Sequence, residues 1–319
     1  MKWEKQGLIF NPTEHTIFGD CKEFAQSPQA IVLKDRVRIF FSTREKTGQK
    51  FISQIAFVDF DKKMQSIIGI SEKPVIAQGE LGCFDEHGIF PISPFVHDNK
   101  LYAYTCGWSR RKSVSVDTSI GLAISTDNGL SFQRLGNGPI LSSSLNEPML
   151  VGDGFVKHFE GPFHMWYIFG KHWLAPTESE PPARVYKIAH ATSDNGIEWK
   201  KEDGKCIISD KLGLEECQAL PTVIKISDTY HMYFCYRQAT DFRTNPTRGY
   251  RLGYAYSSDL KSWVRTDDKS GLESSTEDWD SDMECYPNLF QVDQQVYLLY
   301  NGNQFGKFGF GLAKLMSVN

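Results

Sequence analysis

Five acidic residues occupy the same place in a repeated pattern of this 319-residue chain. Each stands five positions before the start of a short apolar run, and four of the five runs start with proline. The acids are Glu23, Glu86, Glu147, Glu216 and Asp282. Where carboxylates share a water-poor site, like charge raises the pKa of one so that it can donate a proton, whereas an arginine keeps its neighbour ionised. Cleavage of a glycosidic bond needs such a pair.

Three of the five repeats carry additional acids ahead of the apolar run, which makes them the best candidates for chemistry. They span residues 84–91, 214–221 and 279–287. We predict Glu216 as the general acid, with Glu86 or Asp85 as the base or as an electrostatic stabiliser. Glu147 and Asp282 are predicted to bind substrate hydroxyls.

The strands that must position these acids recur with the same spacing. A second strand rich in Tyr and Phe opens at intervals of 62 to 67 residues, at Val37, Leu101, Phe163, Tyr230 and Val296. A third strand follows, and in three repeats it runs into an Asp-Asn-Gly turn or a shortened form of it. Asn and Gly adopt positive φ at low cost, which is typical of hairpin turns. A repeat of this length predicts a four-stranded sheet with its loops.

The last repeat stops after its third strand, near Leu315, and would leave an exposed sheet edge. Residues 3–9 resemble residues 199–205, where a fourth strand is expected. We therefore predict an all-β fold, a five-bladed β-propeller formed by residues 1–319 as one domain, with the ring closed by the N-terminal strand. The blades are expected at about 22–80, 81–143, 144–210, 211–278 and 279–319 with 1–10. The alternatives are an open β-sandwich and a six-bladed sialidase, which needs one more repeat.

In a propeller the inner strands start at the rim of the central channel, so the residues ahead of them converge on one mouth. The second strand runs antiparallel to the first and returns its last residues to that mouth. Such a collection of side chains suits a sugar, because hydroxyls bind carboxylates and amides while the sugar ring packs on Trp or Tyr. The predicted substrate-binding residues are Glu23, Arg44, His87, Trp108, Arg111, Glu147, Arg237, Asp282, Glu284 and Asn301.

A long loop in the fourth repeat, residues 238–251, concentrates Arg243, Arg248 and Arg251 beside Arg237. One interpretation is a solvated loop. The other is an anion clamp at the mouth for a phosphate, a sugar carboxylate or a nucleotide diphosphate, because arginine binds such oxyanions through two parallel hydrogen bonds.

Charge and composition narrow the partners. A net charge of −4 gives no electrostatic reason to expect nucleic acid or an anionic membrane. Seven cysteines without a CxxC pair favour free thiols in a reducing compartment. The first residues lack a signal-peptide pattern and no segment approaches the ~18–20 apolar residues of a membrane span, so we expect a cytoplasmic protein. Propeller acids have no fixed ligand spacing, and neither a metal nor a cofactor is predicted.

At this level the chain resembles the five-bladed propeller superfamily of glycoside hydrolases, which includes families 43, 32, 68 and 130. The likeness rests on the acid-to-proline pattern, the Tyr-rich second strand and the Ser-x-Asp-x-Gly type of turn. Glu216-Cys217 resembles the Glu-Cys pair that carries the acid/base glutamate in the invertase-like families. The chain departs from the pattern at Ser27, since the invertase-like and family 43 enzymes place an aspartate before the equivalent of Pro28.

The resemblance implies a carbohydrate-active enzyme, either a glycoside hydrolase or, if the arginines hold phosphate, a phosphorylase. Its substrate is expected to be a small carbohydrate or a glycosyl phosphate. Residues 86–91 and 300–303 also resemble uncharacterised glycosylase-like propellers of bacterial surface-polysaccharide loci. The alternative is a non-catalytic propeller that binds a sugar or a sugar nucleotide, as the missing aspartate before Pro28 would predict.

Overall fold

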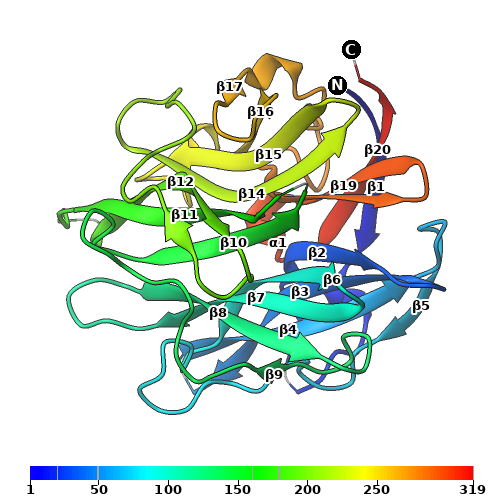
Figure 1. The fold of residues 1–319 in the computed structure, drawn as a ribbon, viewed down its shortest axis with the longest axis horizontal. Helices are drawn as coiled ribbons and strands as arrows, with labels where there is room; N and C mark the ends of the chain where they lie inside the picture. Colours follow the sequence, from blue (N-terminus) through cyan, green and yellow to red (C-terminus); the bar gives the residue numbers. More distant parts are fainter. Residues whose placement is uncertain (20, 49, 160, 179, 319) are drawn as a thin grey trace.

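The structure is mainly β-strand. It is a computed structural model that describes residues 1–19, 21–48, 50–159, 161–178 and 180–318. In these residues the strands form five antiparallel sheets of four strands each. Figure 1 shows the sheets grouped around a common centre, with the colour changing from blade to blade along the chain.

Each sheet is one blade, and in blades 1 to 4 the strands follow one another outward from the centre in chain order. Blade 1 contains β2 (Gln26–Val32), β3 (Val37–Thr47), β4 (Lys50–Phe60) and β5 (Ile67–Ile70). Blade 2 contains β6 (Ile89–His97), β7 (Lys100–Ser109), β8 (Asp117–Ser125) and β9 (Gln133–Arg134). Blade 3 contains β10 (Val151–His158), β11 (Phe163–Leu174), β12 (Ala183–Ser193) and β13 (Lys200–Lys201). Blade 4 contains β14 (Glu216–Ile226), β15 (Thr229–Gln238), β16 (Arg251–Ser257) and β17 (Val264–Arg265). Blade 5 contains β18 (Cys285–Val292), β19 (Gln295–Asn301), β20 (Phe310–Ser317) and β1 (Lys2–Phe10), and the short helix α1 (Asn303–Gly306) follows β19. Short 3-10 helices lie at Pro12–Glu14, Pro246–Arg248 and Asp267–Lys269.

The innermost strands form a closed ring. β2 packs against β6, β6 against β10, β10 against β14, β14 against β18, and β18 returns to β2. The prediction of a five-bladed β-propeller is therefore confirmed.

The N-terminal strand completes the last blade, as the sequence predicts. β1 pairs antiparallel with β20, so that Trp3 lies opposite Leu315. The indole of Trp3 is buried and donates hydrogen bonds to the Tyr233 hydroxyl at 2.8 Å and the Ser270 carbonyl at 3.0 Å. The first strand of the chain thus ties blade 5 to blade 4 and closes the ring.

Each inner strand contains a β-bulge near its start, seen as a register shift in its pairing with the second strand. In four blades one bulge residue has positive φ: Ser27 (54°), Asp153 (54°), Leu220 (48°) and Tyr286 (55°). Phe90 occupies the same place in blade 2, ahead of a cis peptide bond. A bulge sets two residues opposite one and re-aims a side chain, so these five bulge residues stand apart from the regular alternation of their strands.

The inner edges of the central strands have no further strand to pair with, and side chains of neighbouring blades take that role. The Ala30 amide donates to Asn288 Oδ1 at 2.9 Å, from blade 1 to blade 5. The Leu289 amide donates to Thr222 Oγ1 at 2.9 Å, from blade 5 to blade 4. Buried amides without such acceptors would be costly, so these bonds fix adjacent blades to one another.

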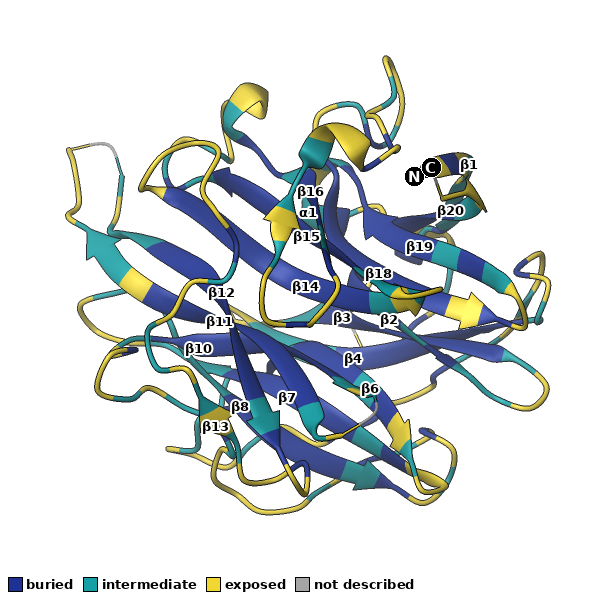
Figure 2. Ribbon diagram, turned by 45° about the horizontal axis from the view of Figure 1, so that its top comes forward, coloured by how far each residue is buried: buried dark blue, intermediate teal, exposed yellow. Residues whose placement is uncertain are grey.

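The hydrophobic core is divided into five clusters, each lying chiefly between two neighbouring blades. Figure 2 shows that burial follows the middle of the strands, while the hairpin ends are exposed. No helix among the described residues is long and apolar enough to cross a membrane.

Candidate functional site

In four blades a buried acid at the start of the inner strand or just ahead of it binds a basic residue on the outermost strand of the same blade. We call these four carboxylates the pre-strand acids. The pairs are Asp85–Arg134 at 2.6 Å, Glu147–Lys201 at 2.7 Å, Glu216–Arg265 at 2.6 Å and Asp280–Lys5 at 2.6 Å. Each acid is at most 1% exposed. Two of the five repeated acids of the sequence, Glu147 and Glu216, therefore form ion pairs that cross their blades, whereas in blades 2 and 5 Asp85 and Asp280 form the pair in place of Glu86 and Asp282.

The surroundings of Glu216 leave its carboxylate little access to a ligand. One oxygen accepts hydrogen bonds from the Lys211 and Leu212 amides, both at 2.8 Å. The other accepts from Gln218 Nε2 at 2.9 Å and from Arg265 Nη1 at 2.6 Å. The residue is fully buried. This geometry favours a structural role, in which Glu216 fastens the outer strand to the start of the inner one.

Glu147 is held in the same way. Its carboxylate accepts hydrogen bonds from the Tyr167 hydroxyl at 2.8 Å, Lys201 Nζ at 2.7 Å and the Gly204 amide at 3.1 Å. The pre-strand acids therefore lie inside separate blades, and the structure does not bring them together at the centre.

Three predicted residues gather at the start of blade 2. Glu86 and His87 are half-buried, and Glu86 Oε1 lies 3.5 Å from His87 Nδ1. The His87 ring stacks on Trp108 with ring centroids 5.5 Å apart, and burial lowers the pKa of His87. This cluster has one carboxylate and an aromatic face, and it contacts blade 1 through the hydrogen bond of Arg110 to the Phe51 carbonyl.

Three further predicted residues lie at the periphery. Glu23 is half-exposed and pairs with Lys307 at 3.4 Å. Arg111 is exposed and pairs with Asp117. The side chain of Asp282 is exposed. Among the described residues, no interaction links these three side chains to the centre of the ring.

Asn301 is a fully buried structural residue. Its side chain accepts a hydrogen bond from the Ser27 amide at 2.7 Å and donates to the Ala25 and Gly309 carbonyls at 2.8 and 2.7 Å. It therefore fixes the bulge of β2 against blade 5. Arg44, by contrast, reaches the central region, where it donates to Gln26 Oε1 at 3.1 Å.

Glu284 is buried beside the pre-strand acid of blade 5, with Lys5 Nζ 3.6 Å from its Oε1. Burial raises the pKa of the Glu284 carboxyl to about 7, Lys5 opposes this shift and Asp280 adds to it. The Glu284 side chain is therefore mostly protonated below about pH 7.

The shift at Glu284 makes stability depend on pH. Since its folded-state pKa is raised, the stabilisation by its protonated form is complete below pH 4.5 and is lost as pH rises through about 7. From about pH 5 to about pH 8 we expect the wild type to lose about 2 kcal/mol relative to Glu284→Gln. Urea unfolding at both pH values measures this, with Glu23→Gln as the control. Parallel pH profiles for wild type and Glu284→Gln would contradict the assignment.

Aromatic side chains from three blades meet at the centre of the ring. Phe90 of blade 2 and Tyr286 of blade 5 meet with ring centroids 5.5 Å apart, although these blades are not neighbours. Tyr250 of blade 4 lies against Tyr286, again at 5.5 Å. We call these three rings together with Asp153 the axial site. Phe90, Tyr286 and Asp153 are bulge residues, so the β-bulges position two of the three rings and the carboxylate.

Asp153 is the single carboxylate among the five bulge residues. It is 8% exposed, accepts a hydrogen bond from the Leu220 amide at 3.3 Å, and burial raises the pKa of its carboxyl to about 7. Sequence reasoning missed it because blade 3 lacks the proline that marks the others. The structure changes how the third repeat is matched to the other four. Gly154, and not Gly152, occupies the position where the other blades have proline.

Arginine and aromatic side chains pack together next to the axial site. The Tyr186 and Tyr250 hydroxyls lie 2.6 Å apart, and Arg237 Nη2 donates to the Tyr186 hydroxyl at 2.8 Å. The Arg237 guanidinium also packs 3.5 Å above the Phe242 ring. Arg184 lies close enough to Asp153 to lower the pKa of its carboxyl, against the larger effect of burial.

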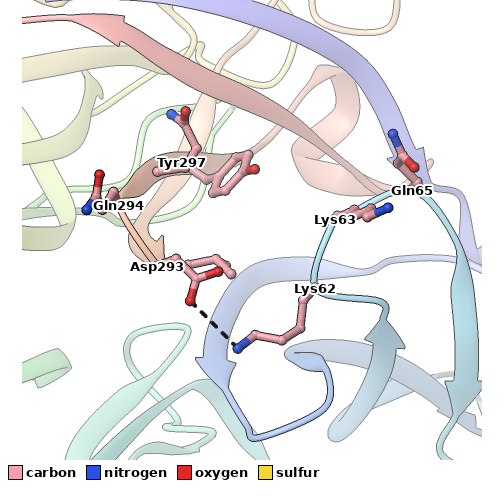
Figure 3. Close-up of a pocket in the computed structure, with 8 residues that line it drawn as sticks. Lys62, Lys63, Gln65, Asp293, Gln294 and Tyr297 are labelled. Carbon is pink, nitrogen blue, oxygen red and sulfur yellow. Dashed lines mark ion pairs between the residues drawn. The ribbon is translucent and has the colours of Figure 1, made fainter.

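A separate pocket of about 570 Å³ lies at the opposite end of the propeller, between the turns after β18 and β4 (Figure 3). Lys62, Lys63, Gln65, Asp293 and Tyr297 line it, and Lys62 pairs with Asp293 at 3.9 Å. It contains none of the residues predicted to act on a sugar.

Comparison with solved structures places the fold among the five-bladed propellers of glycoside hydrolases. A structure described as "Glycoside hydrolase" aligns with a TM-score of 0.74 at 16% identity, over 99% of this chain and 92% of that one. A thermostable family-43 glycoside hydrolase gives 0.65 at 14% identity over 92% and 90%. A structure from work on the GH130 family of mannoside phosphorylases gives 0.66 at 14% identity over 98% and 93%. The predicted resemblance to these propellers is confirmed at the level of the fold.

Sequence comparison defines the family more narrowly. No protein-family model matches the chain. The uncharacterized proteins Rv1502 and MT1551 of two Mycobacterium tuberculosis strains are each 31% identical over 318 residues, which is 99% of this chain and 99% of theirs. The chain belongs to the same family as these mycobacterial proteins.

Proposed function

We propose that this protein is a carbohydrate-active enzyme that cleaves or transfers a glycosidic bond at the axial site, with Asp153 as the proton-transferring residue. One observation carries the proposal: Asp153, a buried carboxyl group with a pKa of about 7, holds the same bulge position on its inner strand as Phe90 and Tyr286, whose rings meet at the centre of a propeller of the glycoside hydrolase type. A group with this pKa is populated in both protonation states at neutral pH, as general acid–base catalysis requires.

The chemistry of the proposal uses this chain's own residues. Asp153 would donate its proton to the leaving oxygen as the bond to the anomeric carbon breaks, while the rings of Phe90 and Tyr286 offer apolar faces to the sugar. The pre-strand acids are bound within their blades and supply no second carboxylate there. A nucleophile that needs no general base fits this arrangement. Phosphate is such a nucleophile, so we favour phosphorolysis over hydrolysis with two carboxylates.

A non-catalytic role is the second candidate, and a specific observation favours it. Ser27 occupies the bulge of blade 1, where the resemblance implies an aspartate. A propeller that binds a sugar or a sugar nucleotide without turnover would keep the aromatic and arginine groups and lack that acid. A cytoplasmic location and a role in surface-polysaccharide metabolism stay predictions.

The test is turnover by wild type and Asp153→Asn on a panel of aryl glycosides, glycosyl phosphates and oligosaccharides with phosphate. We expect turnover by the wild type, a pH profile governed by a group that titrates near 7, and a loss of about a hundredfold or more in Asp153→Asn. Glu23→Gln is the matched control, because Glu23 is peripheral and half-exposed. Full activity in Asp153→Asn would refute the assignment, and sugar binding without any turnover by the wild type would favour the binding role.

A further inference from the structure

The twelve arginines of the chain fall into two groups by their partners. Six form ion pairs with acids among the described residues: Arg36, Arg38, Arg111, Arg134, Arg248 and Arg265. The other six have no such pair there: Arg44, Arg110, Arg184, Arg237, Arg243 and Arg251. All of the second group lie near the end of a second strand, in the loop after it or at the start of a third strand, and so at the end of the propeller where the inner strands begin. Among the described residues, arginines without an ion-paired acid are thus concentrated on the face that holds the axial site.

Three of these arginines share aromatic partners and so form one cluster. Arg184 and Arg237 lie over the same Tyr186 ring, with Cζ 5.8 and 5.3 Å from its centroid. Arg237 and Arg243 lie over the same Phe242 ring, at 3.5 and 4.3 Å. We call Arg184, Arg237 and Arg243 the arginine cluster. Tyr186 in turn contacts Tyr250 of the axial site, and Arg184 lies close enough to Asp153 to act on its carboxyl, so the cluster adjoins the axial site.

The central member of the cluster is buried in an unusual way. Arg237 is 2% exposed, yet its guanidinium donates only to neutral acceptors: the Gln238 and Ala239 carbonyls and the Tyr186 hydroxyl. Its Nε atom is buried with no hydrogen-bond partner among the described residues. A buried charge normally has a counter-ion, and three adjacent cations repel one another. A bound anion would supply the missing counter-charge.

We infer that the arginine cluster binds a phosphoryl group of the substrate, so that the axial site acts on a sugar that carries phosphate or on a sugar together with inorganic phosphate. Guanidinium groups bind tetrahedral oxyanions through paired hydrogen bonds, and three of them match a phosphate ester of about −1.5 to −2 charge better than a single carboxylate. This inference rests on the proposed function for the sugar part of the ligand. The binding of the phosphoryl group does not depend on turnover.

The experiment measures binding by calorimetry to the full chain with inorganic phosphate, a hexose 1-phosphate and a nucleoside diphosphate hexose, with the free hexose and a hexuronate as uncharged and carboxylate comparisons. We expect saturable binding of at least one phosphoryl ligand, weakened by salt, and the three arms identify whether free phosphate or a sugar phosphate is preferred. No saturable binding in any phosphoryl arm, or hexuronate bound as tightly as hexose 1-phosphate, would overturn the inference.

Two arginines of one loop provide a matched pair of variants. Arg243 is exposed and belongs to the cluster, whereas Arg248 pairs with Asp241 at 3.6 Å, so each glutamine variant removes one charge from the same loop. We expect Arg243→Gln to weaken phosphoryl binding about tenfold or more and Arg248→Gln to change it less than about twofold. Equal weakening by both variants would mean that the overall charge of the loop, and not the arginine cluster, controls binding. That result would overturn the inference. Asp153→Asn should still bind phosphate, so a failed catalytic proposal and a failed anion site give different results.

Discussion

Replacing Glu147 with alanine should lower the free energy of unfolding by about 3–5 kcal/mol, among the largest effects of any single substitution in this protein. Lys201 is only 11% exposed and would keep its charge after losing the carboxylate 2.7 Å away. The Tyr167 hydroxyl and the Gly204 amide would lose their acceptor as well. Denaturant unfolding followed by fluorescence measures the change, because Trp166 and Trp199 lie in the same blade.

Glu23→Ala is the matched control for this prediction. Glu23 heads the first repeat, but it is half-exposed and its contact with Lys307 is 3.4 Å long, so its removal should change stability by about 0.5 kcal/mol or less. Replacing both members of the buried pair, as in Glu147→Leu with Lys201→Met, should recover much of the loss because no unpaired charge stays buried. If Glu147→Ala is no more destabilising than Glu23→Ala, the ion pair across the blade does not contribute to the stability of the fold.

We expect a chain that lacks residues 1–10 to lose the cooperative thermal unfolding transition of the full chain. Blade 5 would keep three strands, and β20 would expose the edge that β1 now covers. Two large buried side chains, Trp3 and Phe10, would leave the core, and each is worth about 3–5 kcal/mol by truncation to alanine. Asp280 would lose Lys5, its partner on the outer strand.

Calorimetry and near-ultraviolet circular dichroism of the shortened chain test this prediction. A synthetic peptide of residues 1–11 should restore the cooperative transition when added in excess, because the strand pairs through its own backbone and side chains. An unchanged transition in the shortened chain would show that the ring is held closed without β1.

The fold could be predicted from the sequence because its signals are local and repeated five times. Tyr- and Phe-rich second strands recur at regular spacing, and the turns that begin at Ser125, Ser193 and Ser257 carry their own hydrogen bonds from backbone amides to the serine hydroxyl. Even the closure by the first strand was visible, since Trp3 opens a segment that resembles the fourth strand of blade 3. Agreement among periodicity, turn chemistry and an otherwise open edge left few alternatives.

The site could not be predicted in the same way, because its geometry depends on pairing between distant residues. A repeated acid is compatible with both a catalytic ring and a set of buried ion pairs. The difference lies in the bases Arg134, Lys201 and Arg265, which follow their acids by 49 to 54 positions. That spacing was the available signal. Asp153 had no such mark, since burial rather than a motif sets the pKa of its carboxyl.

The contact between Phe90 and Tyr286 crosses the centre of the ring and joins two blades that are not neighbours. If the proposed function is right, this contact should hinder a long glycan from passing along the propeller axis from end to end. We would then expect action on the terminal unit of such a chain, with the remainder held outside, and a released monosaccharide would leave before the next terminus docks.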